Sequence, residues 1–282
     1  MPRLRVSAIS YLNTAPLMWN FEHEPTAHVL RNDFQVEYTI PSRCAELLAN
    51  GQADIGIIPV AAYATIPDLH ILPAIAIASQ RAVRSILLVS EKPLEQVQRV
   101  AIDSSSRTSA ALVQVLFAKH FRQDVRFEQA SPELDAMLAR YDAALLIGDP
   151  ALNVDRSRYQ TWDLAEEWRA FSGKPFVFAF WAVRIAAATD EELARIGEIF
   201  RESRDRGLMH FDEIASEWAP RLSLSRDLIV SYLSDNIHYS LEPEYVSGMQ
   251  LFFRYASELG VLPRAPELHF VPELAGNSNR SK

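Results

Sequence analysis

The chain has 282 residues, of which 49% are hydrophobic and 23% are charged. This composition is that of an ordinary globular protein with room for two modest domains or one large one. The formal net charge of −8 argues against a nucleic-acid-binding surface. Cys44 is the only cysteine and the seven histidines are scattered, which excludes a disulfide framework within the chain and gives no zinc-site spacing.

The sequence contains neither a membrane segment nor a nucleotide-binding motif. The apolar run from Ile71 to Ala78 is too short to span a bilayer and includes Pro73. The first residues enter an apolar strand without the pattern of a secretory signal, and no G-x-G-x-x-G or P-loop motif is present. We therefore expect a cytoplasmic protein with no metal, no cofactor, no nucleic-acid partner and no membrane partner.

The first predicted strand, 4–9, ends in a polar turn before a helix. The polar residues of this turn are Ser10, Tyr11, Asn13 and Thr14. Thr14 is predicted to cap the helix, which Pro16 helps to start. Ligands of open α/β sheets bind beyond the carboxyl ends of the strands, so the turn is a candidate binding edge. Asn13 has an uncharged amide that donates and accepts hydrogen bonds; alternatively, it only closes an Asx turn.

Strands and helices alternate through the first 90 residues. The predicted strands are 34–40, 53–59, 69–78 and 84–90. A helix at 43–50 separates the first two, with Ser42 as its N-cap and Gly51 as its end. This alternation is typical of a doubly wound sheet. A break in the pattern at 91–93 is expected to mark a crossing into another domain.

A second alternating unit follows the break. Its predicted elements are a strand at 100–102, a helix at 107–121, a strand at 125–127, a helix at 133–140 and a strand at 143–147. A strand at 176–183 is predicted to carry the chain back to the first domain. The last hundred residues have helical periodicity, and the helices predicted there are 191–206, 211–218, 227–237 and 244–259.

The strongest local signal for ligand binding is the run Ser104–Ser109, which carries hydroxyl groups at every position except 107. A strand ends and a helix begins there, so free backbone N–H groups and the helix dipole favour an anion. Ser106 is the predicted N-cap, and Thr108 and Ser109 add donors. Arg107 is suited to hold a carboxylate through two hydrogen bonds. Alternatively, the hydroxyl groups only cap the helix, although one serine would suffice for that.

Three other places carry weaker signals. Ser42 could offer helix N–H groups to an anion or only cap its helix. Gly148 and Asp149 follow a strand, and a carboxylate there would suit a ligand hydroxyl. Ser85 lies near the expected crossing. Since the sequence has no G-x-S-x-G elbow and no recognisable Cys–His pairing, the residues by themselves predict a two-lobed protein that binds a small carboxylated ligand, without establishing catalysis.

Five segments of the chain together resemble one enzyme family. They are Ser10–Leu17 (SYLNTAPL), Asp54–Pro59 (DIGIIP), Ser105–Ser109 (SSRTS), Ile147–Leu152 (IGDPAL) and Pro175–Trp181 (PFVFAFW). Their order and spacing, over nearly the whole chain, are similar to those of the chorismate dehydratases of the futalosine route to menaquinone. The dihydroxynaphthoate synthases of that route share the fold, but their opening segment typically reads S-P-C-P-N-D rather than S-Y-L-N-T.

The resemblance implies a two-lobed α/β fold like that of the type 2 periplasmic binding proteins, with a mixed sheet flanked by helices in each lobe. Residues 1–88 and 182–282 would form a discontinuous first lobe that carries the C-terminal helices. Residues 89–181 would form the second lobe. The ligand would lie in the cleft between them.

The resemblance also implies a reaction, in which chorismate loses water to give 3-[(1-carboxyvinyl)oxy]benzoate. Because an aromatic ring forms, positioning can contribute most of the catalysis. Asn13 is the expected catalytic residue, hydrogen-bonded to the leaving hydroxyl or a developing charge, and the proton goes to the substrate's enolpyruvyl carboxylate or to Asp149. The expected substrate-binding residues are Ser10, Tyr11, Thr14, Ser42, Ser85, Ser105, Ser106, Arg107, Thr108, Ser109, Gly148 and Asp149. The alternatives are an enzyme like 1,4-dihydroxy-6-naphthoate synthase and a non-catalytic binding protein for a small carboxylate.

Overall fold

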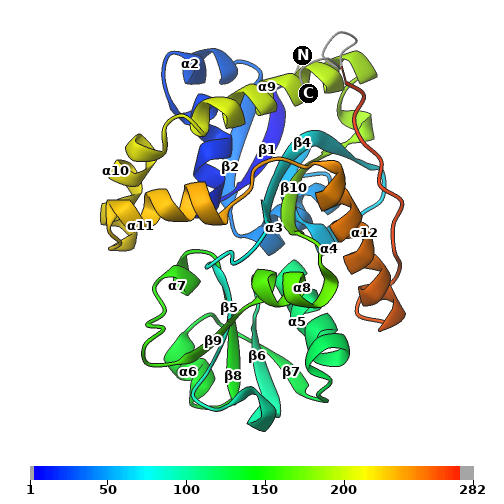
Figure 1. Cartoon of the computed structure of the whole chain (residues 1–282). Helices are drawn as coiled ribbons and strands as arrows, with labels where there is room; N and C mark the ends of the chain where they lie inside the picture. The colour runs from blue at the N-terminus through cyan, green and yellow to red at the C-terminus, as the bar shows by residue number, and fades with distance from the viewer. Residues whose placement is uncertain (1–2, 274–282) are drawn as a thin grey trace.

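The computed structural model describes residues 3–273, which form two α/β lobes that lie one above the other in Figure 1. Each lobe contains one five-stranded sheet. The first sheet consists, in spatial order, of β2 (Phe34–Thr39), β1 (Leu4–Ile9), β3 (Ile55–Pro59), β10 (Phe176–Arg184) and β4 (Leu69–Ser79). The second sheet consists of β7 (Arg126–Ala130), β6 (Arg99–Asp103), β8 (Ala143–Ile147), β5 (Ile86–Ser90) and β9 (Gln160–Asp163).

Both sheets are mixed. In the first, β1 runs parallel to β2 and β3, whereas β10 runs antiparallel to β3 and β4. In the second, β6 runs parallel to β7 and β8, whereas β5 runs antiparallel to β8 and β9. The predicted fold class, a two-lobed α/β architecture with a mixed sheet in each lobe, is confirmed.

Helices cover the faces of both sheets (Figure 1). Those before β5 are η1 (Leu12–Met18), α1 (Trp19–Glu22), α2 (Thr26–Leu30), α3 (Pro41–Ala49) and α4 (Val60–Tyr63). Those between β5 and β10 are η2 (Leu94–Gln96), α5 (Thr108–Leu116), η3 (Phe117–Phe121), α6 (Leu134–Leu138), α7 (Asp149–Leu152) and α8 (Leu164–Ser172). Those after β10 are η4 (Ile185–Ala187), α9 (Asp190–Gly207), α10 (Phe211–Leu222), α11 (Arg226–Ser231), η5 (Tyr232–Asn236) and α12 (Pro243–Glu258).

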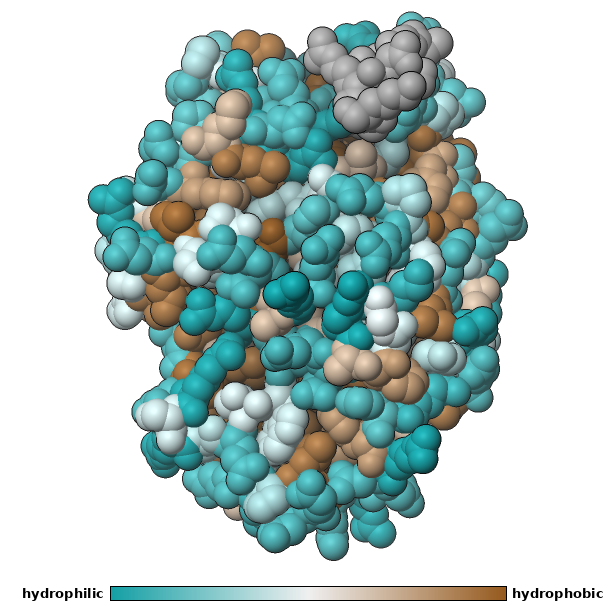
Figure 2. Space-filling view, viewed as in Figure 1, coloured by the Kyte–Doolittle hydropathy of each residue, from teal (hydrophilic) through white to brown (hydrophobic). Residues whose placement is uncertain are grey.

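Apolar strands form the core of each lobe. β3, β5 and β8 are buried along their whole length, as continuous apolar runs predict for inner strands. Trp181 of β10 packs edge-on against Phe200 of α9, with 4.7 Å between ring centroids. Figure 2 shows one side of the protein surface, where hydrophilic residues predominate and hydrophobic ones form small separate groups. Within residues 3–273, no helix combines the length and the apolar character that crossing a membrane requires.

Two helices of the first lobe begin earlier than predicted. The turn after β1 continues at once into the 3-10 helix η1 from Leu12, so Thr14 lies inside the helix and is not its cap. α3 begins at Pro41, with Ile40 as its N-cap and Ser42 as its second residue. Proline is favoured at a first helical position because its fixed φ angle fits the helix and its missing N–H is not needed there. The predictions of Thr14 and Ser42 as caps are therefore wrong.

The second lobe differs from the prediction at α5 and between β8 and β10. α5 begins at Thr108 with Arg107 as its N-cap, so the prediction of Ser106 as the cap is wrong. The strand β9 and the helix α8 are absent from the sequence-based prediction. β9 is short and half polar, and it is held at the sheet edge by its pairing with β5. Asp163 then caps α8 by accepting hydrogen bonds from the backbone N–H groups of Ala165 and Glu166.

The chain crosses between the sheets at places other than those predicted. β5 belongs to the second sheet and β10 to the first. The predicted lobe boundary at 88/89 therefore falls inside β5, and the one at 181/182 falls inside β10. The expected break at 91–93 follows β5 and is not the crossing. The carboxylate of Asp163 fixes the first crossing by accepting the N–H groups of Val83 and Arg84, at 3.0 and 2.6 Å. We propose that the chain leaves the discontinuous first lobe for the second at 80–85 and returns to it at 173–175.

The four predicted C-terminal helices are present as α9, α10, α11 with η5, and α12. α9 packs on η1, α1 and β4, and α10 packs on η1, so both cover the first lobe. α12 contacts both β10 of the first lobe and α5 of the second, and Figure 1 shows it beside both lobes. The last long helix therefore belongs to the junction of the lobes as well as to the first lobe.

Candidate functional site

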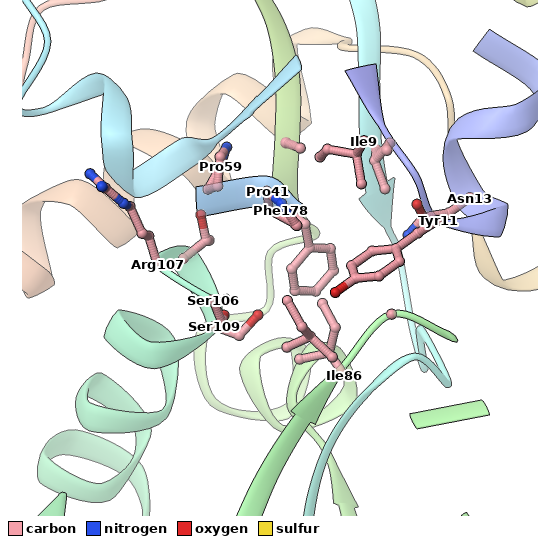
Figure 3. Close-up of a pocket in the computed structure, with 15 residues that line it drawn as sticks. Ile9, Tyr11, Asn13, Pro41, Pro59, Ile86, Ser106, Arg107, Ser109 and Phe178 are labelled. Atoms are coloured by element: carbon pink, nitrogen blue, oxygen red, sulfur yellow. The ribbon is translucent and has the colours of Figure 1, made fainter. Parts of the chain in front are cut away.

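A cavity lies between the lobes at the carboxyl ends of several strands (Figure 3). The first lobe contributes Ile9, Tyr11, Asn13, Pro41, Pro59, Ile77, Phe178 and Ala179. The second lobe contributes Ile86, Ser106, Arg107, Thr108, Ser109, Ile147 and Gly148. In Figure 3 the rings of Tyr11 and Phe178 lie side by side with Ile86 beneath them, and Arg107 lies on the other side. The cavity thus combines an apolar wall with a cluster of hydrogen-bond donors.

Seven of the residues singled out from the sequence line this cavity. They are Tyr11, Asn13, Ser106, Arg107, Thr108, Ser109 and Gly148. Each lies just beyond the end of β1, β6 or β8. The carboxyl ends of these strands meet at one edge in each sheet, and the two edges face each other. This is why residues more than 130 positions apart in the sequence come together.

The N-termini of two helices lie at the cavity, one from each lobe. Pro41 is the first residue of α3 and Thr108 the first of α5, and both line the cavity. The N–H groups of a first helical turn have no acceptor within the helix, and the helix dipole adds positive potential there. Neither helix has a side-chain cap that uses these donors. The two N-termini can therefore bind negative charge.

Arg107 adds a positive charge beside the start of α5. Its side chain is half-exposed, and Nη2 lies 3.7 Å from Oε1 of Glu46 in the first lobe. At this separation the ion pair is loose and solvent-screened. The guanidinium group is therefore available to a carboxylate in the cavity.

Thr108 connects the lobes. Its hydroxyl oxygen accepts a hydrogen bond from the backbone N–H of Ala61, at 3.1 Å. Thr108 is buried, and Ala61 lies in the first turn of α4. The side chain that the sequence suggested as a ligand donor thus satisfies a buried N–H group of the opposite lobe.

Tyr11 also contacts the second lobe. Its hydroxyl lies 3.5 Å from Oγ of Ser105, and burial raises the pKa of the phenol. Ser105 in turn donates from its backbone N and from Oγ to Oδ1 of Asp103, at 2.8 and 2.7 Å. Burial raises the pKa of this fully buried Asp103 carboxyl, although the Ser105 donors oppose the shift. Tyr11 therefore remains a neutral phenol at the cavity wall.

Asp149 directly follows Gly148, a residue that lines the cavity. Its Oδ1 accepts a hydrogen bond from the backbone N–H of Leu12 in the first lobe, at 3.0 Å. Burial raises the pKa of Asp149 to about 6, and the Leu12 N–H group opposes that shift. The carboxyl group therefore changes its charge state near neutral pH.

Six of the residues singled out from the sequence do not line the cavity itself. Ser10 is exposed and donates to the carbonyl of Thr39, at 3.2 Å, and Thr14 is buried in η1. Ser42 is half-buried in α3. The other three have hydrogen-bond partners within the protein: Ser85 accepts from Tyr232, Ser105 donates to Asp103, and Asp149 accepts from Leu12.

The apolar wall is the part of the site that the sequence did not single out. Its members are Ile9, Pro41, Pro59, Ile77, Ile86, Ile147, Phe178 and Ala179. Three of them could have been found in the sequence by their place at strand ends, since Ile9, Pro59 and Ile147 are the last residues of β1, β3 and β8. Among residues 3–273, no three His, Cys, Asp or Glu side chains gather as metal ligands would.

Comparison with known proteins identifies the family. A family model described as menaquinone biosynthesis matches residues 4–258. The chain belongs to this menaquinone-biosynthesis family. A chorismate dehydratase of Thermus thermophilus is 31% identical in sequence, over 93% of this chain and 96% of that protein. The family resemblance seen in the sequence is thereby confirmed.

Solved structures place this member of the menaquinone-biosynthesis family among the periplasmic-binding-protein-like folds. A crystal structure of an Archaeoglobus fulgidus protein aligns with a TM-score of 0.75 at 18% identity, over 92% of this chain and 98% of that one. The periplasmic aliphatic sulphonate-binding protein of Escherichia coli aligns with a TM-score of 0.66 at 16% identity, over 94% and 95%. These likenesses confirm the predicted fold, whose two lobes enclose a cleft.

Proposed function

We propose that the protein is a carbon–oxygen lyase that dehydrates chorismate to 3-[(1-carboxyvinyl)oxy]benzoate in menaquinone biosynthesis. The family and the Thermus thermophilus relative, which is named a chorismate dehydratase, support this activity. The observation in the molecule that supports it best is the cavity where an apolar wall meets two helix N-termini and Arg107. Chorismate has a ring and two carboxylates, which match in chemical character an apolar wall and two groups of hydrogen-bond donors.

The substrate's carboxylates bind to the two donor groups of the cavity. The N-terminus of α5, with Arg107, Ser106 and Ser109, receives one carboxylate. The N-terminus of α3 receives the other from the opposite lobe. The ring lies against the wall that includes Phe178 and Ile86. Each lobe thus holds one end of the substrate.

The reaction needs positioning more than strong acid or base groups. The proton at C3 leaves, the bond between C4 and the hydroxyl oxygen breaks, and the C3–C4 double bond completes an aromatic ring as water departs. No oxidation occurs and no cofactor is required. Asn13 donates a hydrogen bond to the leaving hydroxyl. The enolpyruvyl carboxylate of the substrate accepts the C3 proton and delivers it to that hydroxyl, which departs as water. Asp149, which loses its own proton near pH 6, is the alternative acceptor.

The substrate is a small molecule, and the enzyme acts in the cytoplasm. Neither a nucleic acid nor a membrane is needed as a partner. A net charge of −8 makes the local donors essential, because the overall field repels a dianion.

Incubation of the protein with chorismate tests the proposal. The aromatic product is followed by its ultraviolet absorption and identified by mass spectrometry, with the Asn13→Asp variant as the matched comparison. Turnover by the wild-type protein is expected, and the variant should lose about 100-fold in kcat because a carboxylate cannot donate the hydrogen bond. Binding of chorismate without turnover would instead identify a binding protein. Full activity of Asn13→Asp would remove Asn13 from its role.

A further inference from the structure

We infer that a second cavity, in the first lobe, binds a free amino acid with an aromatic side chain. This cavity lies between η1, β2 and α10 and has a volume of about 270 Å³. We call it the α10 cavity. Figure 1 shows α10 at the left edge of the first lobe. The inference goes beyond the proposed function and does not depend on it.

The inner wall of the α10 cavity is apolar. Ala15 and Met18 of η1 line it and are 7% and 0% exposed. Ile9 and Tyr11 line both this cavity and the one between the lobes, so the two cavities are neighbours. Thioether groups and aromatic rings make favourable contacts with an aromatic ligand. The inner wall therefore suits an aromatic side chain.

Two further aromatic side chains line the α10 cavity nearer the protein surface. Tyr38 of β2 is 42% exposed, and Trp218 of α10 is half-buried. Exposed apolar groups that gather at a cavity are typical of a ligand site. Pockets for small molecules have volumes of about 300 Å³ and more, so this cavity, at about 270 Å³, suits a ligand of amino-acid size.

Arg221 brings a positive charge with unused donors to the α10 cavity. Its guanidinium group lies over the ring of Trp218, 5.2 Å from the ring centroid, because residues three apart share one face of a helix. The ring attracts the cation and so helps to hold it in place. Within the described part of the chain, this guanidinium forms no ion pair and no hydrogen bond. Its donors are therefore free to bind a carboxylate.

Glu22, the last residue of α1, brings a negative charge to the same cavity. The hydroxyl of Tyr38 donates to its Oε1, which helps to fix the direction of the carboxylate. Oε2 has no hydrogen-bond donor among residues 3–273. A carboxylate oxygen without a donor can accept from an ammonium group. The aromatic face of Tyr38 attracts a cation as well.

Opposite charges at one cavity select a ligand that carries both. A simple carboxylate would meet Glu22 as a like charge, and a simple amine would meet Arg221 as a like charge. Among the described residues, Glu22 and Arg221 form no ion pair with each other that a ligand would have to break. An α-amino acid has its ammonium and carboxylate on one carbon atom. It can pair with both residues and place its side chain against the inner wall.

Calorimetric titration of the protein with L-phenylalanine tests the inference, with two analogues as matched probes. 3-Phenylpropionate lacks the ammonium group, and 2-phenylethylamine lacks the carboxylate. We expect one phenylalanine to bind per chain. Each analogue should bind at least about 10-fold more weakly, because one charged residue loses its partner. Equal binding of either analogue would overturn the inference, as would the absence of phenylalanine binding at concentrations up to about 10 mM.

Four variants test whether the charged residues of the cavity are responsible. Glu22→Gln and Arg221→Gln should each weaken phenylalanine binding about 10-fold or more. Glu217→Gln and Arg226→Gln are the matched controls, since these residues lie in α10 and α11 but outside the cavity lining. Both controls should bind phenylalanine as the wild type does. An equal loss of affinity in the controls would show that general charge is responsible, and the inference would fail.

The indole signal of Trp218 reports on the cavity itself. The chain has five tryptophans, and in protein labelled with ¹⁵N-tryptophan the Trp218 signal is identified by its loss in Trp218→Phe. It should move as phenylalanine is added, both in the wild type and in Arg107→Ala. Binding that leaves this signal unmoved, or that Arg107→Ala abolishes, would assign the ligand to the cavity between the lobes and overturn the inference.

Discussion

The ring of Tyr11 in the first lobe lies directly against Gly148 in the second. A Cβ atom built at position 148 would come within 2.6 Å of two ring carbons. Gly148 also has φ 65° and ψ −145°, a combination that is essentially confined to glycine. The close approach of the two lobes at the cavity therefore depends on the absence of a side chain at this point.

Replacement of Gly148 by alanine should keep the lobes apart. We expect kcat/KM to fall by about 10-fold or more because the residues of the cavity are then misplaced, and the free energy of unfolding to fall by about 1–3 kcal/mol. Gly173→Ala is the control, since Gly173 also has a positive φ, 69°, but a Cβ atom added there would meet nothing within 4 Å. The control should lose about 1–2 kcal/mol of stability and no activity. Equal activity of the two variants would contradict the role of the Tyr11 contact.

The charge state of Asp149 should make stability depend on pH. Burial raises its pKa to about 6 in the folded protein, above the value of about 3.9 in an unfolded chain. The folded state therefore binds the proton more tightly, and its stability falls as the pH rises from about 4 to 6. Asp149→Asn keeps an oxygen for the Leu12 N–H and carries no charge. It should be more stable than the wild type by about 1–3 kcal/mol at pH 8 and equal to it at pH 4.

Urea unfolding between pH 4 and pH 8 measures this difference, and Asp142→Asn should give the opposite trend. The hydrogen bond from Lys92 holds the pKa of Asp142 below its ordinary value, helped by the backbone N–H groups of Gln98 and Arg99. That carboxylate contributes stability above its ordinary pKa and loses it as the pH falls. The Asp142 variant should therefore be less stable than the wild type at pH 8. Parallel pH profiles for the two variants would refute the assignment of Asp149.

The local pattern of apolar and polar residues in the sequence was enough to predict most strands and the place of the site. β1, β6 and β8 are apolar runs followed by polar turns, and this pattern located Asn13, Arg107 and Gly148 at the cleft. The role of Thr108 was not predictable in this way, because its hydroxyl accepts from the N–H of Ala61 across the cleft.

Arg107 should contribute to binding more than to the chemical step. Loss of a charge-assisted hydrogen bond to a carboxylate in Arg107→Ala should raise KM by about 10- to 100-fold, with kcat little changed because the interaction is the same in substrate and transition state. Arg43→Ala is the matched control. Arg43 pairs with the same Glu46, at 3.2 Å, but is outside the cavity lining. The KM of Arg43→Ala should equal that of the wild type. An unchanged KM in Arg107→Ala would remove Arg107 from the site.

Thr108 should stabilise the contact between the lobes through its hydroxyl oxygen. Thr108→Val keeps the shape of the side chain but leaves the N–H of Ala61 without an acceptor in a buried place. The cost should be about 1–3 kcal/mol in the free energy of unfolding, because a buried donor loses its partner and regains no water. The same change at Thr65, an exposed residue just beyond α4 whose hydroxyl donates to the carbonyl of Ala62, should cost less than about 0.5 kcal/mol. Urea unfolding of both variants measures the difference. An equal loss in the two would mean that the bond from Ala61 to Thr108 does not contribute to holding the lobes together.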